Sequence, residues 1–412
     1  MTASRWFRRK VDMSTRLRLA AGLDAGSSRT RCVICVVEDS RIRFLGAGEV
    51  ESRGWVKGRI ADPAAMSECV RLAAREAEKN AQTPVEGVVA GLGGTAVLGS
   101  NARGIYEFGH PREIAEQDMG YAVERACRVR LEDDRVLLQV FPQDFTVDGR
   151  AGFHNPKGTR CSRLEANVHV VTTSAADHQS LVSAVHKAHL GVEETVFEAM
   201  ASAYAAVLPE ERNRGVVLID IGMQSTDLVI YDGDALVQAA SYPISADHFT
   251  RDVAIGLTTS YEDAEKLKQE YGCAILGLTS DNTLIEVPSA EGRPARETTR
   301  RQLNEILEAR AEELFYYVKQ EITAAGMEQS LLEGVVLSGG GALLPGMCDM
   351  AERVLNCQAR NGLAVGLQDW PDALDNPAWT TAAGLAMYSA RLKERRDFKK
   401  KSPGFISLVL RS

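Results

Sequence analysis

Residues 216–231 read VVLIDIGMQSTDLVIY, an apolar run that ends in Asp220, then a glycine turn, then a second apolar run. Aliphatic and β-branched residues on both sides of such a turn predict two strands joined by a tight connection. Residues 19–34, LAAGLDAGSSRTRCVI, follow the same plan with Asp24 and Gly26. One such stretch alone is compatible with a plain hairpin. Two copies in one chain predict two similar halves.

Length and composition fit a globular protein of two to four domains: 412 residues, 45% hydrophobic and 25% charged. The net charge of −8 argues against a nucleic-acid binder that neutralises phosphates over its whole surface. No apolar stretch approaches a bilayer-spanning length and the N-terminus lacks a secretory apolar region, so we expect a soluble body. The eight cysteines lack the spacing of a disulfide framework, which favours a reducing cytoplasm.

Cys32 and Cys35 form a CxxC pattern inside an apolar run. The run is typical of a strand, and residues three apart on a strand face opposite sides. We therefore expect neither a shared metal nor a disulfide.

The rest of the chain supplies further elements. A helix is expected at residues 63–80, a buried strand at 85–92 and a strand at 335–338. Residues 246–272 and 302–325 have helical character. Residues 100–172 differ from the flanking sequence in combining a predicted helix near 114–130 with strands at 136–141 and 164–171. We interpret them as an inserted α+β subdomain.

The two Asp-containing turns suit a nucleoside triphosphate with Mg²⁺, which needs close backbone N–H donors, small residues and carboxylates. Asp24 and Asp220 are the candidates for holding Mg²⁺, partly through water. The small residues that would clamp the phosphates are Gly26, Ser27, Ser28, Gly222, Ser225 and Thr226.

A third turn, Gly339, Gly340 and Gly341, follows the strand at 335–338. Its glycines would let the backbone pass close to a base and ribose, or would serve only as a tight strand-to-helix turn. The three turns together resemble the sugar kinase, Hsp70 and actin superfamily. That resemblance implies an α/β, actin-like two-lobed ATPase fold of duplicated ribonuclease H-like domains, with ATP and Mg²⁺ in the cleft between the lobes.

Several other stretches resemble the FtsA family of bacterial actin-like cell division proteins. They are SRGWVKG at 52–58, PQDFTVDG at 142–149, NPKG at 155–158, RLEANVH at 163–169, FEAMASA at 197–203 and RDVAIGL at 251–257. The resemblance implies a basic N-terminal extension (1–17), a lobe I core (18–99, 173–207 and 376–396), the inserted subdomain (100–172), a lobe II core (208–246 and 325–375), a small subdomain (247–324) and a membrane-targeting tail (397–412).

The same resemblance assigns roles to individual residues. Glu265 and Lys268 match positions that contact ribose and adenine, although an ordinary surface ion pair on one helix face would have the same spacing. Arg29 stands where the family often has Lys and would reach a phosphate. Glu198 lies near the position of the attacking water and is the candidate catalytic residue.

This sequence departs from the family pattern at the second phosphate turn, where Met223 and Gln224 replace glycines. Their side chains would crowd the approach of backbone N–H groups to the phosphates. Ser245 and Ala246 also replace a later glycine pair. We therefore expect slow, weak or absent ATP hydrolysis and weakened nucleotide binding.

The C-terminus is basic although the chain as a whole is acidic, with eight basic and two acidic residues in 391–412. An apolar tip beside basic residues suits an anionic leaflet, each Lys or Arg contributing about 1 kcal/mol. A frayed, solvated tail is the alternative. The predicted membrane residues are Lys399, Lys400, Lys401, Phe405, Ile406, Leu408, Val409 and Leu410.

The FtsA resemblance implies a cell division protein that polymerises on the cytoplasmic face of the inner membrane at the septum. Its expected partners are the C-terminal peptide of FtsZ, further copies of itself and anionic lipid, and it would recruit later divisome components. The alternatives are a PilM-like adaptor of type IV pilus assembly and a small-molecule kinase of the same superfamily. Any enzymatic activity would be a weak ATPase at most.

Overall fold

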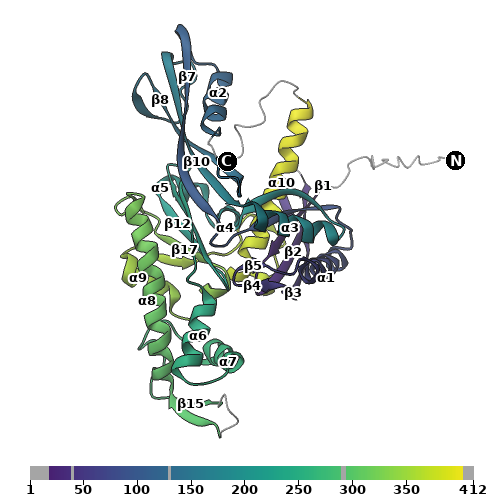
Figure 1. Ribbon diagram of the computed structural model, residues 1–412, viewed down its shortest axis with the longest axis vertical. Helices are drawn as coiled ribbons and strands as arrows, with labels where there is room; N and C mark the ends of the chain where they lie inside the picture. Colours follow the sequence, from purple (N-terminus) through teal and green to yellow (C-terminus); the bar gives the residue numbers. More distant parts are fainter. Residues whose placement is uncertain (1–17, 39–40, 129–130, 289–293, 402–412) are drawn as a thin grey trace, which may run out of the picture.

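The computed structural model describes residues 18–38, 41–128, 131–288 and 294–401. Figure 1 shows an elongated molecule with a sheet-and-helix projection at one end and a helical part at the other. Two larger sheets lie between these ends. We call the part built on the six-stranded sheet lobe I and the part built on the five-stranded sheet lobe II.

The lobe I sheet has the strand order β11-β6-β1-β2-β3-β19. β1 is antiparallel to β2 and parallel to β6. The strands are β1 (Arg18–Ala25), β2 (Arg29–Glu38), β3 (Arg41–Glu51), β6 (Gly87–Leu92), β11 (Gly191–Phe197) and β19 (Leu367–Gln368). A small hairpin, β4 (Trp55–Val56) and β5 (Arg59–Ile60), follows β3.

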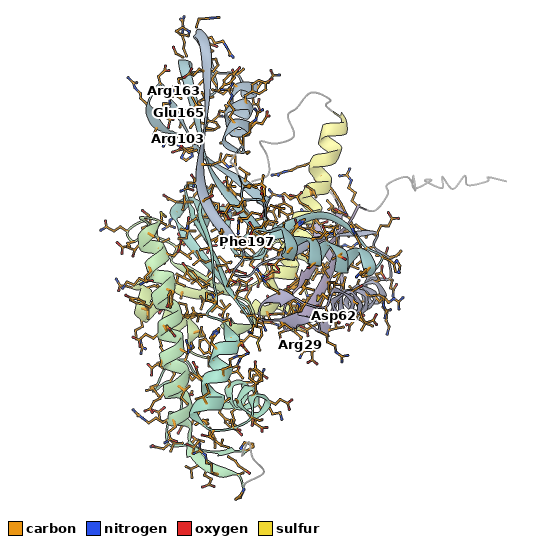
Figure 2. The ribbon with its side chains drawn as sticks, in the orientation of Figure 1. Arg29, Asp62, Arg103, Arg163, Glu165 and Phe197 are labelled. Atoms are coloured by element: carbon orange, nitrogen blue, oxygen red, sulfur yellow. The ribbon has the colours of Figure 1, made fainter. Side chains whose placement is uncertain are left out.

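Helices cover both faces of this sheet: α1 (Pro63–Ala81) and α3 (Ala175–Lys187) on one, α4 (Glu198–Ala206) and α10 (Thr380–Lys401) on the other. α1 begins where expected because Asp62 accepts hydrogen bonds from the N–H groups of Ala64 and Ala65 (2.9 and 3.1 Å), a cap that stabilises a helix by about 1 kcal/mol (Figure 2). Cys32 packs in the core beneath α1, whereas Cys35 packs beneath α10. The two thiols therefore face opposite sides, as predicted, and none of the eight cysteines, all of which lie among the described residues, forms a disulfide.

The lobe II sheet repeats the pattern of lobe I, with the order β14-β13-β12-β17-β18. β12 is antiparallel to β13 and parallel to β17, as β1 is to β2 and β6. The predicted duplication is therefore confirmed in the topology. The strands are β12 (Val216–Ile221), β13 (Thr226–Asp232), β14 (Ala235–Tyr242), β17 (Val335–Ser338) and β18 (Ala359–Asn361), and α5 (Pro209–Arg214) precedes β12.

The helical end of lobe II holds α6 (Ala246–Gly256), α7 (Tyr261–Tyr271), α8 (Arg300–Ala324) and α9 (Met347–Leu355), with a hairpin of β15 (Leu284–Val287) and β16 (Arg296–Thr299). The expectation of helix throughout 246–272 is wrong. Thr258 takes a positive φ of 48° and ends the first helix. Ser260 then starts α7 by accepting a hydrogen bond from the Asp263 N–H (3.1 Å).

The projection is the predicted insert, a sheet of order β7-β10-β8-β9 with α2 packed on one face (Figure 1). Its elements are β7 (Leu98–Glu113), α2 (Glu116–Ala126), β8 (Arg135–Val147), β9 (Arg150–Phe153) and β10 (Arg160–Ser174). On this sheet Glu165 pairs with Arg103 at 3.5 Å and with Arg163 at 3.0 Å (Figure 2).

The insert is attached to lobe II as well as to lobe I. His169 of β10 accepts a hydrogen bond from the Ala239 N–H of β14 (3.1 Å) and lies 2.7 Å from Asn101 Oδ1. Gln143 donates to the carbonyls of Leu236 and Val237, both at 3.3 Å. The insert therefore bridges the two halves of the molecule.

Much of the predicted C-terminal tail lies outside the described residues. Residues 399–401 form the end of α10, but the side chains of Lys399, Lys400 and Lys401 are not described. The apolar tip with Phe405, Ile406, Leu408, Val409 and Leu410 and the basic extension at 1–17 also lie outside. Within the described ranges, no helix is both long and apolar enough to cross a membrane.

Candidate functional site

A cleft of about 920 Å³ lies between the two lobes. Both Asp-containing turns and the Gly339 turn open into it. Thr226 does not line the cleft, because it is buried and donates its hydroxyl to the Ile244 carbonyl (2.6 Å). The other predicted site residues all line it: Asp24, Gly26, Ser27, Ser28, Arg29, Glu198, Asp220, Gly222, Ser225, Glu265, Lys268, Gly339, Gly340 and Gly341.

Asp24 and Asp220 lie at the ends of the matching central strands β1 and β12, and Asp220 is close enough for its charge to raise the pKa of Asp24. Burial raises the pKa of Asp24 to about 7, the charge of Arg31 opposes that rise, and the charge of Asp220 adds to it. Burial also raises the pKa of Asp220, although Ser202 (2.7 Å) and Thr381 (2.8 Å) donate hydrogen bonds to it. The pair forms an acidic floor for the cleft.

Two further carboxylates join this floor. A Cβ atom built on Gly93 would lie 2.3 Å from Asp227 Oδ2 and 2.4 Å from Glu198 Oε2, so any side chain at this position would displace both carboxylates. Burial raises the pKa of Asp227 to about 7, and burial together with the neighbouring Asp24 raises that of Glu198. The sequence prediction omitted Asp227. The sequence feature that could have identified Asp227 is its position, as a charged residue, within the largely apolar strand β13.

Arg31 is a second residue that the sequence prediction missed. Its guanidinium lies 3.8 Å from Asp24 and 2.6 Å from Glu49, and it stacks over the Trp379 ring at 5.3 Å. Arg31 therefore supplies a fixed positive charge inside the acidic floor. Arg29, two residues earlier, lies exposed at the edge of the cleft (Figure 2).

The third turn packs directly on the second. A Cβ atom at Gly339, whose φ is +81°, would lie 2.4 Å from Asp220 Oδ1 and 2.5 Å from the Ile221 carbonyl oxygen. A single 3₁₀ turn, Gly340–Leu343, follows, and α9 begins only at Met347. The glycine run thus lets the backbone approach the acidic floor.

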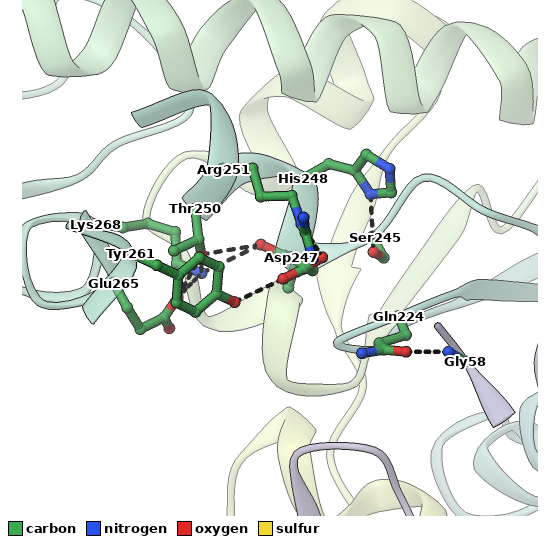
Figure 3. A network of polar contacts seen from close by, with 11 residues as sticks. Gly58, Gln224, Ser245, Asp247, His248, Thr250, Arg251, Tyr261, Glu265 and Lys268 are labelled. Carbon is green, nitrogen blue, oxygen red and sulfur yellow. Dashed lines mark hydrogen bonds and ion pairs between the residues drawn. The ribbon is translucent and has the colours of Figure 1, made fainter. Parts of the chain in front are cut away.

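The far end of the cleft is formed by α6 and α7. Lys268 Nζ is 2.7 Å from both Glu265 Oε2 and Thr250 Oγ1, and its side chain is only 10% exposed (Figure 3). Burial would raise the pKa of Glu265, but the hydrogen bond and charge of Lys268 outweigh burial and lower it. The predicted pair does share one helix face, and it is built into the cleft wall.

A second network lies beside this pair. Asp247 bonds Arg251 at 2.5 Å and the Tyr261 hydroxyl at 2.7 Å (Figure 3). It fixes the start of α6 against α7. Arg251 begins the stretch RDVAIGL, whereas Asp247 and Tyr261 come from positions that no sequence motif singled out.

The Met223–Gln224 turn also faces the cleft. Gln224 Oε1 accepts a hydrogen bond from the backbone N–H of Gly58, which belongs to the β4–β5 hairpin of lobe I (Figure 3). The Met223 carbonyl accepts from the Asp247 N–H at 3.0 Å. The turn that departs from the family pattern therefore makes one contact across the cleft, to Gly58, and one within lobe II, to Asp247.

Two halves of the same topology that enclose an acidic cleft, with an α+β insert in the first, define an actin-like fold. Solved structures that share this fold include the following two. The PilM–PilN type IV pilus biogenesis complex superposes with a TM-score of 0.66 and 19% identity, covering 90% of this chain and 98% of that chain. MreB5 of Spiroplasma citri bound to ADP superposes with a TM-score of 0.55 and 13% identity, covering 94% of this chain and 99% of that chain.

Sequence comparison is more specific. Residues 217–384 match the family model for cell division protein FtsA, and residues 94–172 match that for the SHS2 domain inserted in FtsA. The cell division protein FtsA of Pseudomonas aeruginosa is 32% identical over 372 residues, which cover 90% of this chain and 89% of the relative. The chain belongs to the FtsA family of cell division proteins.

Proposed function

We propose that the cleft binds ATP with Mg²⁺. The observation that carries this proposal is that Asp24 and Asp220, each at the end of a matching central strand, face one cavity together with the Gly339 turn. The described residues contain no cluster of three or more His, Cys, Asp or Glu side chains placed to hold a metal ion. Mg²⁺ suits such a site, because it binds through one or two carboxylates, water and substrate phosphates.

The residues have distinct roles in this proposal. Asp24 and Asp220 hold Mg²⁺, partly through water, and Gly26, Ser27, Ser28, Gly222 and Ser225 face the phosphates. Arg29 reaches a phosphate from the cleft edge. Glu265 and Lys268 contact the nucleoside, and Gly339 to Gly341 lie against the base and ribose. Bound ATP would supply the phosphoanhydride bond. Glu198, at the start of α4, would orient the attacking water.

Titration with a fluorescent ATP analogue, with and without Mg²⁺, tests this site. We expect Mg²⁺-dependent binding that Asp24→Asn and Asp220→Asn each weaken by about tenfold or more, the order of one charged contact. Asp232→Asn changes an exposed carboxylate at the end of β13 and is the matched control. Binding that is equal in all four proteins would reject the site.

We propose further that the chain polymerises on the cytoplasmic face of the inner membrane at the division septum and recruits FtsZ and later divisome components. Membership of the FtsA family supports this proposal. The basic and apolar composition of residues 397–412 supports attachment to an anionic leaflet. Full-length protein should pellet with anionic liposomes, and a chain that ends at Arg396 should not. Equal pelleting would remove the C-terminal anchor.

The partner peptide separates this role from the alternatives. We expect the chain to bind the C-terminal peptide of FtsZ and not the N-terminal peptide of PilN. The reverse result would support the PilM-like adaptor, which the likeness in fold leaves open. Phosphoryl transfer from ATP to a small acceptor would support a kinase.

A further inference from the structure

Gln224 occupies the tip of the second phosphate turn. The N–H of Gly222 donates to the Ser225 carbonyl at 2.9 Å and closes the turn, so that Met223 and Gln224 form its tip. Both residues line the cleft. Gln224 Oε1 reaches the backbone N–H of Gly58 on the opposite side (Figure 3).

The acceptor and the donor of this bond belong to different lobes. Gly58 lies at the tip of the β4–β5 hairpin, which is tied to lobe I by an ion pair of 3.5 Å between Arg59 and Asp177 of α3. Gln224 lies between β12 and β13 of lobe II. The bond therefore joins lobe II to lobe I across the cleft.

A second bond crosses the cleft beside the first. The N–H of Gly94 in lobe I donates to the Asp227 carboxylate in lobe II, at 3.2 Å to the nearer oxygen. The Gly58 carbonyl oxygen would be 3.9 Å from a Cβ atom on Gly94, so the two lobe I donors are neighbours. Together they make a seam across the phosphate end of the cleft.

A backbone N–H at the tip of a turn is the kind of donor that a phosphate oxygen accepts. Here the neutral amide oxygen of Gln224 already accepts it. We infer that Gln224 is an affinity-setting residue: its bond to Gly58 holds the lobes closed without nucleotide and competes with the phosphate oxygens of an incoming nucleotide. The competition rests on the proposed ATP site, whereas the closed seam does not.

Hydrogen exchange at the Gly58 amide in nucleotide-free protein tests the seam. Gln224→Ala should speed this exchange by about fivefold or more, the equivalent of one net hydrogen bond. Gln269→Ala is the matched control, because Gln269 also lines the cleft but bonds Glu265 within its own helix (2.7 Å). Exchange that is equally fast in wild type and Gln224→Ala would overturn the inference.

Binding of a fluorescent ATP analogue tests the competition. Gln224→Ala should bind it about fivefold more tightly than wild type, because the Gly58 donor is released. Met223→Ala makes space in the same turn without removing the bond. An equal gain in Met223→Ala would show that space, and not the bond, sets affinity. If neither wild type nor variant binds the analogue, the proposed ATP site fails. The hydrogen exchange at Gly58 then still tests whether Gln224 holds the two lobes together.

Discussion

Gly94 of lobe I donates its backbone N–H to the Asp227 carboxylate of lobe II, at 3.2 and 3.3 Å to the two oxygens. The two residues are 133 positions apart in the sequence. Burial raises the pKa of Asp227 to about 7, while the Gly94 N–H favours its ionised form. The relative position of the two lobes is therefore coupled to the charge state of the acidic floor.

The contact between the second and third turns predicts a sharp difference between two adjacent glycines. Gly339→Ala forces a positive φ on alanine and a clash with Asp220 and Ile221, and should cost about 2 kcal/mol or more of folding stability. A Cβ atom on Gly340 meets nothing within 4 Å, so Gly340→Ala should fold as well as wild type. Thermal unfolding of both variants checks this, and equal destabilisation would contradict the packing.

Lys268 and Lys266 on α7 provide a second matched pair. Lys268→Met leaves Glu265 half-buried without its cation and should cost about 1–3 kcal/mol of stability. Lys266 is 74% exposed and only 3.5 Å from Asp263, and Lys266→Met should change stability by less than about 0.5 kcal/mol. Denaturant unfolding measures both, and similar losses would show that the cleft pair is an ordinary surface contact.

His169 makes the bridge between the insert and lobe II sensitive to pH. Burial lowers its pKa from 6.5 to about 4. Because the unfolded chain binds more protons between these values, this contribution to stability is complete above about pH 6.5 and is lost, by up to about 3 kcal/mol, as the pH drops from about 6.5 to about 4. His169→Gln does not titrate, and its denaturant midpoint should fall less over the same range. Parallel pH profiles would contradict this.

The crowded second phosphate turn predicts slow ATP turnover. Met223 and Gln224 line the cleft where small residues would leave backbone N–H groups open to phosphates. Phosphate release by purified protein should therefore be close to the level of the Asp220→Ala variant. Robust turnover that Asp220→Ala abolishes would refute weak hydrolysis.

Much of the fold could be predicted because its signals are local. The apolar run before Asp220 predicted β12, and apolar periodicity from residue 63 to 80 predicted α1. The prediction failed at residues 257–260, where a positive φ at Thr258 and the cap at Ser260 interrupt a pattern that is helical on both sides. The ends of a helix depend on single residues, whereas the apolar periodicity that predicts the helix is averaged over many residues.

The candidate site was predicted only in part, because local sequence patterns do not show which side chains meet in the folded molecule. Asp24 and Gly339 stand in recognisable turns, and both line the cleft. Thr226 stands in one of these turns as well, but its hydroxyl bonds the Ile244 carbonyl inside lobe II. A turn motif fixes the position of a residue along the chain, and packing decides which way its side chain points.

The duplicated strands, the two Asp turns, the glycine run and the inserted subdomain can all be predicted from local sequence, because strand alternation and turn chemistry act between near neighbours. The position of Arg31 within the acidic floor and the contact of Gln224 with Gly58, 166 residues away, depend on the folded molecule. Such contacts depend on how two separately folded sheets close on each other. A hydrogen bond between the lobes is specified by the position of both partners in space, which no local pattern encodes.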